Sequence, residues 1–291
     1  MRIAAAAGVL LLVAAGGVWL ATTIALNQNS RTVIPAPPGG IESSRFAASD
    51  GVVLEGWWWP GRDRWRAVIL LHGLQADRLQ MFSRAKWLHR LGYSVLLFDF
   101  RGCGKSGGTA TFGFRERLDV EAALEFVRER KRVTGSILLG QSMGAAAALM
   151  ASASWGSEVR GAILESPFDR FESAVRIRVR NVVGSLEPAV SPLLLAQVPF
   201  RLGFHPEDLA PVEAMRKAHG PVLLGFGGRD PYLGPGQVAG LFREAPYPAT
   251  LWVVQKAGHT DLFRFDPQAY RAKIGEFIAA ALGPPDGGGQ E

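Results

Sequence analysis

Residues 136–150 of this 291-residue chain read SILLGQSMGAAAALM, and this stretch decides the fold. Its first four residues predict a short buried strand, and the small side chains of 143–153 predict a helix. Between them Gly140 and Gly144 flank Ser142 in the pattern G-x-S-x-G. A serine on a sharp turn from strand to helix projects its hydroxyl above the sheet, and the glycines avoid collisions with the neighbouring strand and helix. Because the amides at a helix N-terminus favour a developing oxyanion, Ser142 is a candidate nucleophile.

The alternation of strand and helix continues on both sides of this stretch. Apolar runs predict further strands at 67–71, 94–98, 161–164, 222–226 and 250–254. Apolar residues at helical spacing predict a helix at 115–131, and further helices are predicted at 79–91, 237–242 and 267–281. An Asp50-Gly51 turn between two extended runs predicts a hairpin ahead of them. This order indicates an α/β fold, a mostly parallel sheet of about eight strands with helices on both faces, whose ligands bind at the carboxyl ends of the strands.

Residues 170–206 interrupt the alternation. They have no strand signal, but apolar side chains recur at helical spacing, at Phe171, Val175, Val179, Val182 and Leu186. An insertion directly after the strand at 161–164 is placed to cover the carboxyl edge, so we predict a helical lid. For its arginines we favour a solvated helix face over contact with lipid head groups; these are Arg176, Arg178 and Arg180.

A serine hydroxyl is a poor nucleophile near neutral pH and needs a base and an orienting acid. His259 follows the strand predicted at 250–254, and Asp230 follows the strand predicted at 222–226, so both lie at the same edge as Ser142. The chain order serine, aspartate, histidine is the one found in α/β-hydrolases. We therefore predict a catalytic triad of Ser142, Asp230 and His259.

Three other carboxylates compete with Asp230 for the role of orienting acid. Asp261 is too close in sequence to His259 to orient it naturally. Glu165 and Asp169 follow a different strand from the one that usually carries this acid.

An oxyanion hole needs two backbone donors. Met143 N–H, directly after the nucleophile, is one candidate, and Leu74 N–H, in the loop after the first parallel strand, is the other. Gly73 is expected to let this loop approach closely. We expect His72 to be structural, hydrogen-bonded within the loop.

The N-terminal residues predict a membrane anchor. Residues 3–26 are 24 residues without a charge, enough for a helix to cross a bilayer core of about 30 Å. A cleaved signal peptide, giving a secreted protein, is the alternative. Arg2 beside the membrane weakly favours an extracytoplasmic catalytic domain. The domain order is then an anchor at 1–26, a Pro/Gly linker at 27–43, a catalytic domain at 44–283 and a disordered tail at 284–291.

Composition points away from other classes of function. The net charge of +6 comes from scattered arginines without a run of five basic residues, which argues against nucleic acid as a partner. The single cysteine, Cys103, excludes an intramolecular disulfide and a zinc site built on several thiolates. Gly102-x-Gly104-x-x-Gly107 matches a dinucleotide fingerprint, but no helix opens there to receive a pyrophosphate. No metal or cofactor is therefore predicted, and the oligomeric state stays open.

Several motifs together resemble the α/β-hydrolase superfamily. They are HG (72–73), DFRGCGKSGG (99–108), GQSMG (140–144), ESPF (165–168), GGRDPYL (227–233) and AGH (257–259). The resemblance is closest to membrane-anchored Bem-like serine hydrolases and to the serine-aminopeptidase-like and monoacylglycerol-lipase-like branches. It implies the same nucleophile, acid and base, and cleavage of an ester, thioester or amide without a cofactor.

We therefore expect a membrane-tethered serine hydrolase that cleaves a carboxylic ester or thioester of a small acyl substrate. The apolar lid favours an apolar acyl chain. A serine aminopeptidase or amidase of the same fold is one alternative, although the arginines of the lid argue against a site for a substrate ammonium. The other alternative is a non-catalytic membrane-bound scaffold.

Overall fold

The computed structural model describes residues 29–259 and 262–283, together with Gly17, Trp19, Thr23 and Asn27. An eight-stranded sheet forms its centre, in the order β1-β2-β4-β3-β5-β6-β7-β8. The strands are β1 (Glu42–Ala47), β2 (Val53–Trp59), β3 (Asp63–Leu71), β4 (Tyr93–Phe98), β5 (Gly135–Gln141), β6 (Val159–Glu165), β7 (Val222–Gly227) and β8 (Ala249–Val254).

The sheet is mostly parallel, as the sequence predicts. The strands β4, β3, β5, β6, β7 and β8 pair in parallel, and only β2 runs antiparallel to its two neighbours, β1 and β4. The turn at Asp50 and Gly51 joins β1 to β2 as the predicted hairpin, and Gly51 supplies a φ of +83°. Parallel pairing brings the carboxyl ends of β5, β6, β7 and β8 to one edge.

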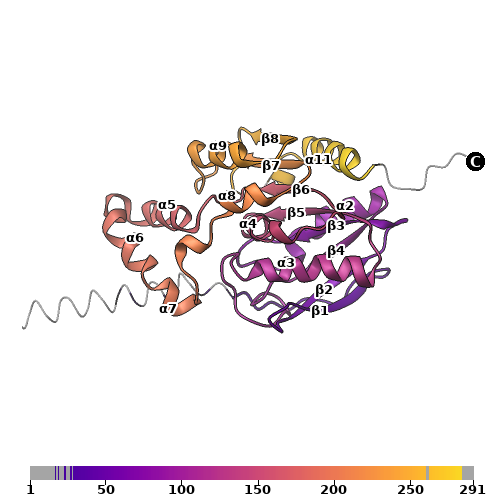
Figure 1. Ribbon diagram of the computed structural model, residues 1–291, viewed down its shortest axis with the longest axis horizontal. Helices are drawn as coiled ribbons and strands as arrows, with labels where there is room; N and C mark the ends of the chain where they lie inside the picture. The colour runs from indigo at the N-terminus through magenta and orange to yellow at the C-terminus, as the bar shows by residue number, and fades with distance from the viewer. Residues whose placement is uncertain are drawn as a thin grey trace, which may run out of the picture.

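Both faces of the sheet are covered because its central strands are apolar on both sides. In β3, Ala67, Ile69 and Leu71 pack into the core on one face, and Val68 and Leu70 pack into the core on the other. The first face is covered by α3 (Glu116–Glu125), α4 (Met143–Met150), α8 (Pro211–Ala214) and α9 (Pro235–Glu244), and the second by α2 (Phe82–Leu91), α10 (Leu262–Phe265) and α11 (Pro267–Leu282). Figure 1 shows this layered body.

The insertion between β6 and β7 is helical, as predicted. It contains α5 (Phe171–Val183), α6 (Glu187–Leu195) and α7 (Val198–Leu202), which project from one side of the body (left in Figure 1). A small apolar core joins these helices to α4; its buried members are Ala146, Phe168, Phe171, Ala174, Val198, Leu202, Phe204 and Leu209. The start of α5 is therefore fixed against the body directly beside the helix that follows Ser142.

The segment predicted as a spacer is attached to the body over its described part. Ser30 N–H donates to Gly102 O at 3.0 Å, and Gly104 N–H donates to Ser30 O at 2.7 Å. The Arg31 guanidinium donates to Ser106 O, and the Ile34 side chain is buried. Backbone pairing and burial thus override the Pro/Gly composition that favours a free linker, and β1 begins at Glu42, inside the predicted linker.

The predicted anchor at 1–26 and the tail at 284–291 lie outside the described residues, apart from Gly17, Trp19 and Thr23. These three positions are helical, and the Arg201 guanidinium of α7 lies 3.6 Å from the centre of the Trp19 ring. None of the helices formed by described residues is both long and apolar enough to cross a bilayer.

Candidate active site

The turn that carries Ser142 holds the serine in a strained backbone conformation. Ser142 lies between β5 and α4 with a φ of +52°, which costs a non-glycine residue on the order of 1–3 kcal/mol. Its N–H donates to Glu165 O at 2.7 Å, which ties the turn to the end of β6. A Cβ on Gly140 would lie 2.6 Å from Ala145 N, and one on Gly144 would lie 2.4 Å from Leu71 O, so both positions require glycine.

A continuous hydrogen-bonded chain joins the three residues of the predicted triad. Ser142 Oγ lies 2.9 Å from His259 Nε2, and His259 Nδ1 lies 2.6 Å from Asp230 Oδ2. The side chain of Asp230 is nearly inaccessible to solvent, and its Oδ1 accepts a hydrogen bond from Tyr232 N–H at 2.8 Å. With Asp230 as an acceptor, Nδ1 carries the imidazole proton and Nε2 is left to accept the serine proton.

Two glycines bring the loops of Asp230 and His259 together. A Cβ on Gly227 would lie 2.1 Å from Gly258 O, and one on Gly228 would lie 2.5 Å from Gln255 O. Arg229 N–H also donates to Ala257 O at 2.9 Å. The GG pair in the GGRDPYL motif therefore sets the separation of acid and base, a role that sequence reasoning missed.

The competing carboxylates have other partners. Glu165 accepts from Arg84 Nη2 at 2.7 Å and from the Tyr270 hydroxyl, whose pKa is raised by burial so that it stays protonated and donates. Asp169 accepts from Gln237 Nε2 at 2.6 Å and from the Ser173 hydroxyl. Asp261 lies outside the described residues. Among the described carboxylates, Asp230 alone is hydrogen-bonded to His259.

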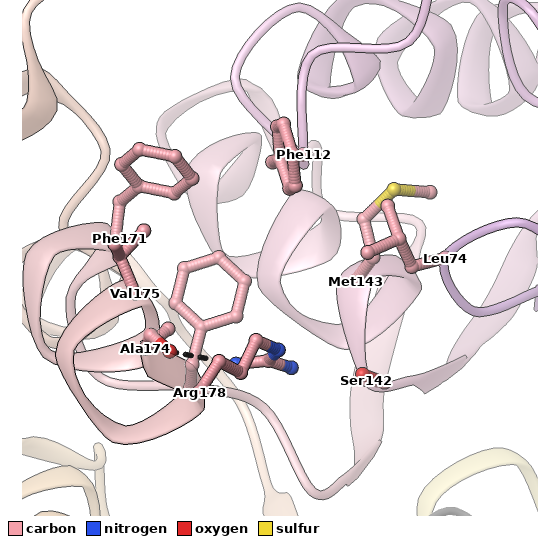
Figure 2. Close-up of a pocket in the computed structure, with 9 residues that line it drawn as sticks. Leu74, Phe112, Ser142, Met143, Phe171, Ala174, Val175 and Arg178 are labelled. Atoms are coloured by element: carbon pink, nitrogen blue, oxygen red, sulfur yellow. Dashed lines mark hydrogen bonds between the residues drawn. The ribbon is translucent and has the colours of Figure 1, made fainter. Parts of the chain in front are cut away.

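The two candidate oxyanion donors lie beside the serine. Leu74 and Met143 line the same hollow as Ser142 (Figure 2), and neither backbone N–H donates to any described residue. Gly73 is not required by lack of space, because a Cβ there would come no closer than 3.4 Å to its neighbours. Gly73 N–H instead donates to Gln80 Oε1 at 2.7 Å, which holds the loop in position.

Sequence and structure comparisons agree with this fold. The family model described as Hydrolase_4, serine aminopeptidase S33, matches residues 63–202. The esterase Pf2001 of Pyrococcus furiosus superposes on the chain with a TM-score of 0.72 at 24% identity, over 88% of this chain and 97% of the esterase. The chain therefore has the α/β-hydrolase fold, and residues 63–202 are similar to this hydrolase family.

The chain is also similar to proteins whose names state no activity. The uncharacterized protein YfhR of Escherichia coli (strain K12) is 26% identical over 288 residues, covering 94% of each chain. The uncharacterized protein Rv2307c of Mycobacterium tuberculosis is 29% identical over 246 residues, covering 80% of this chain and 78% of the relative. An esterase of Exiguobacterium antarcticum shares the fold, with a TM-score of 0.61 at 18% identity over 81% of this chain and 99% of the esterase.

Two hollows lie beside the predicted triad, one lined by Ser142 and the other by His259. The first encloses about 360 Å³, part of it open to solvent, and its lining is mainly apolar: Leu74, Phe112, Met143, Phe168, Phe171, Ala174 and Val175, with Ser142 and Arg178 (Figure 2). The second is larger and more polar, and is lined by Leu79, Gln80, Ser83, Arg84, Gln141, His259, Phe263 and Arg264. Within the described parts of the chain, no three His, Cys, Asp or Glu side chains are grouped to hold a metal ion.

The arginines of α5 do not share the solvated face that the sequence predicts. Arg176 and Arg180 are ion-paired to Glu187, at 3.1 Å and 2.9 Å. Arg178 is half-buried and lines the apolar hollow beside Ser142. The prediction was wrong for Arg178, because α5 packs on the body at the point where this side chain turns inward.

His72 is structural, as expected from the sequence. Its Nδ1 donates to Gly73 O at 2.8 Å, and its Nε2 accepts from Phe100 N–H at 2.9 Å. The ring is fully buried, and burial lowers its pKa below the ordinary value of 6.5. The neutral ring thus joins the loop of Leu74 to the loop after β4.

This histidine predicts a loss of stability in mild acid. Because the pKa of His72 is lower in the folded protein than in the unfolded chain, the unfolded chain binds more protons as the pH falls below 6.5. We expect the free energy of unfolding to decrease there by up to about 1.4 kcal/mol per pH unit from this residue. Urea unfolding of wild type and His72→Gln between pH 7.5 and 5.5 measures it. The variant should be less stable at pH 7.5 but lose less stability on acidification, and equal losses would contradict the prediction.

Proposed function

We propose that this protein is a serine hydrolase that cleaves carboxylic esters or thioesters through an acyl-enzyme intermediate. The observation that carries the proposal is the hydrogen-bonded chain from Ser142 Oγ through His259 to the buried Asp230. The strained turn at Ser142 and the two unengaged amides of Leu74 and Met143 support it.

In the proposed reaction His259 Nε2 takes the hydroxyl proton while Ser142 Oγ attacks the acyl carbonyl. The Leu74 and Met143 amides donate to the oxyanion of the tetrahedral adduct, and Asp230 stabilises the imidazolium. His259 then gives its proton to the leaving alcohol as the carbon–oxygen bond breaks. Water transfers a proton to His259, attacks the acyl-enzyme and releases the acid, and the proton returns to Ser142.

The two hollows suggest which part of the substrate lies where. The leaving group must be near His259, which protonates it, and His259 lines the polar hollow. The apolar hollow is lined by Ser142 and both oxyanion donors. We infer that it takes the acyl chain, and that α5 and the rest of the insertion act as the lid over it.

A serine aminopeptidase is the second candidate, since the matching family model carries that description. It would require an acidic group facing the substrate ammonium, whereas the charged side chain in the apolar hollow is Arg178. Turnover of p-nitrophenyl alkanoates against aminoacyl p-nitroanilides by the purified protein tests the choice. We expect ester turnover to exceed anilide turnover. Preference for the anilides would favour the peptidase, and no turnover of either would favour a non-catalytic scaffold.

We also propose that residues 3–26 anchor the protein in a membrane with the hydrolase on the extracytoplasmic side. The 24-residue uncharged stretch and Arg2 ahead of it support this. The full chain should then stay in the membrane fraction after alkaline carbonate extraction, and protease added outside should reach the hydrolase. Release by carbonate, or a secreted chain lacking the segment, would contradict the proposal.

A further inference from the structure

Arg178 places a positive charge inside an otherwise apolar hollow. The side chain enters from α5 and points across the hollow toward Ser142 (Figure 2). Its neighbours there are Phe171, Ala174 and Val175 from the same helix and Met143 from the opposite wall. A charged group is costly in such surroundings unless it has a partner of opposite charge.

The described residues give Arg178 no such partner. Its Nη1 donates to Ala174 O at 3.0 Å, and its Cζ lies 4.7 Å from the centre of the Tyr232 ring. No carboxylate of the described residues lies within ion-pair distance of it, and the charge of Asp230 is already engaged by His259. Burial lowers the pKa of Arg178 from its ordinary value, and the electrostatic attraction of Tyr232 and Asp230 does not offset this effect.

Two arginines of the same helix show the contrast. Arg176 and Arg180 both form ion pairs with Glu187, and Arg176 also pairs with Glu172 at 3.0 Å. These two charges stabilise the packing of α5 against α6. Arg178 takes no part in that network, so its charge is free for a ligand.

We propose that Arg178 binds an anionic group, a carboxylate at the far end of the acyl chain, so that the preferred substrates are monoesters of dicarboxylic acids. This rests on the proposed function, which places the reacting carbonyl at Ser142 and the acyl chain in the hollow that Arg178 lines. A guanidinium offers five N–H donors in a planar fork that matches a carboxylate. Leu74, Met143 and the phenylalanines of the hollow then contact the methylene chain between the two ends.

The experiment compares esters that differ only at the end of the acyl chain. The p-nitrophenyl monoesters of adipate, pimelate and suberate are measured against the same esters with the free carboxyl capped as a methyl ester. The ratio of the two kcat/KM values is the readout, because it does not depend on the fraction of protein that is folded. In wild type we expect the ratio to favour the free carboxylate for at least one chain length.

Arg178→Gln should lower this ratio by about 10- to 100-fold, the usual effect of losing a hydrogen bond to a charged group. Arg178→Lys should recover part of the preference. Arg176→Gln, on the same helix but paired to Glu187, is the matched control and should leave the ratio unchanged.

Other outcomes would overturn the proposal. If Arg178→Gln slows both esters equally, the residue only positions α5 or Tyr232. If wild type hydrolyses the capped esters but shows no preference for any free carboxylate, the result supports Ser142 as the nucleophile and contradicts the anion site at Arg178. If neither ester is hydrolysed and a fluorophosphonate probe does not label Ser142, the proposed function fails with it.

Discussion

Ser142→Ala is expected to lower kcat/KM for p-nitrophenyl esters by at least about 10⁴-fold and to abolish labelling by a fluorophosphonate probe. The Oγ atom is the group hydrogen-bonded to His259 Nε2, so its removal leaves the base with nothing to activate for acyl transfer. The Leu74 and Met143 amides remain in the variant. A residual rate above that in water is therefore expected from the oxyanion donors and substrate binding.

Ser166→Ala is the matched control for this variant. Ser166 is also buried at the carboxyl end of a central strand, with a φ of +48°, but no hydrogen bond joins its hydroxyl to His259. The Ser166→Ala variant should be labelled like wild type and keep its ester turnover within about threefold, because the hydroxyl that it loses has no hydrogen-bond partner among the described residues. Equal labelling of wild type and Ser142→Ala would exclude Ser142 as the nucleophile.

The sheet and the serine turn could be predicted from sequence because their signals are local. The apolar runs around 67–71 and 136–139 mark buried strands, and the glycines around Ser142 mark a turn that other residues cannot form. The structure confirms the eight-stranded, mostly parallel sheet and the helical insertion. Because the strands are parallel, ligands are expected to bind at the edge formed by their carboxyl ends.

The environment of the site depended on contacts between distant residues that no local pattern encodes. Arg84 and Glu165 pair across 81 residues of sequence, and Gly227 meets the loop of His259 only in the folded chain. The inward turn of Arg178 could not be predicted from α5, because Arg176 and Arg180 have the same local pattern and pair with Glu187 instead. The proline and glycine content of the segment predicted as a spacer likewise did not indicate the backbone pairing of Ser30 with Gly102 and Gly104.

Asp230→Asn is expected to reduce kcat/KM for esters by about 10⁴-fold while leaving the fold intact. The size of the loss follows from which amide atom faces the histidine. Asp230 Oδ1 accepts from Tyr232 N–H, and an asparagine must keep its carbonyl oxygen there, because its NH₂ group cannot accept that bond. The NH₂ group then faces His259 Nδ1 and donates to it. The ring is driven to the tautomer with its proton on Nε2, which can no longer accept the proton of Ser142.

Asp169→Asn separates this tautomer effect from a general loss of negative charge at the edge of the sheet. Asp169 lies after β6, and its Oδ1 accepts from Gln237 Nε2, so its loss removes a carboxylate without touching His259. We expect less than about a tenfold change in kcat/KM for this variant, against a loss near 10⁴-fold for Asp230→Asn. Fluorophosphonate labelling rates should follow the same order, because they report attack by Ser142 without deacylation. If Asp169→Asn proved the more damaging change, the orienting acid would have to be sought after β6 instead of after β7. The hydrogen bond from His259 Nδ1 to Asp230 would then be structural, and a different group would have to stabilise the imidazolium.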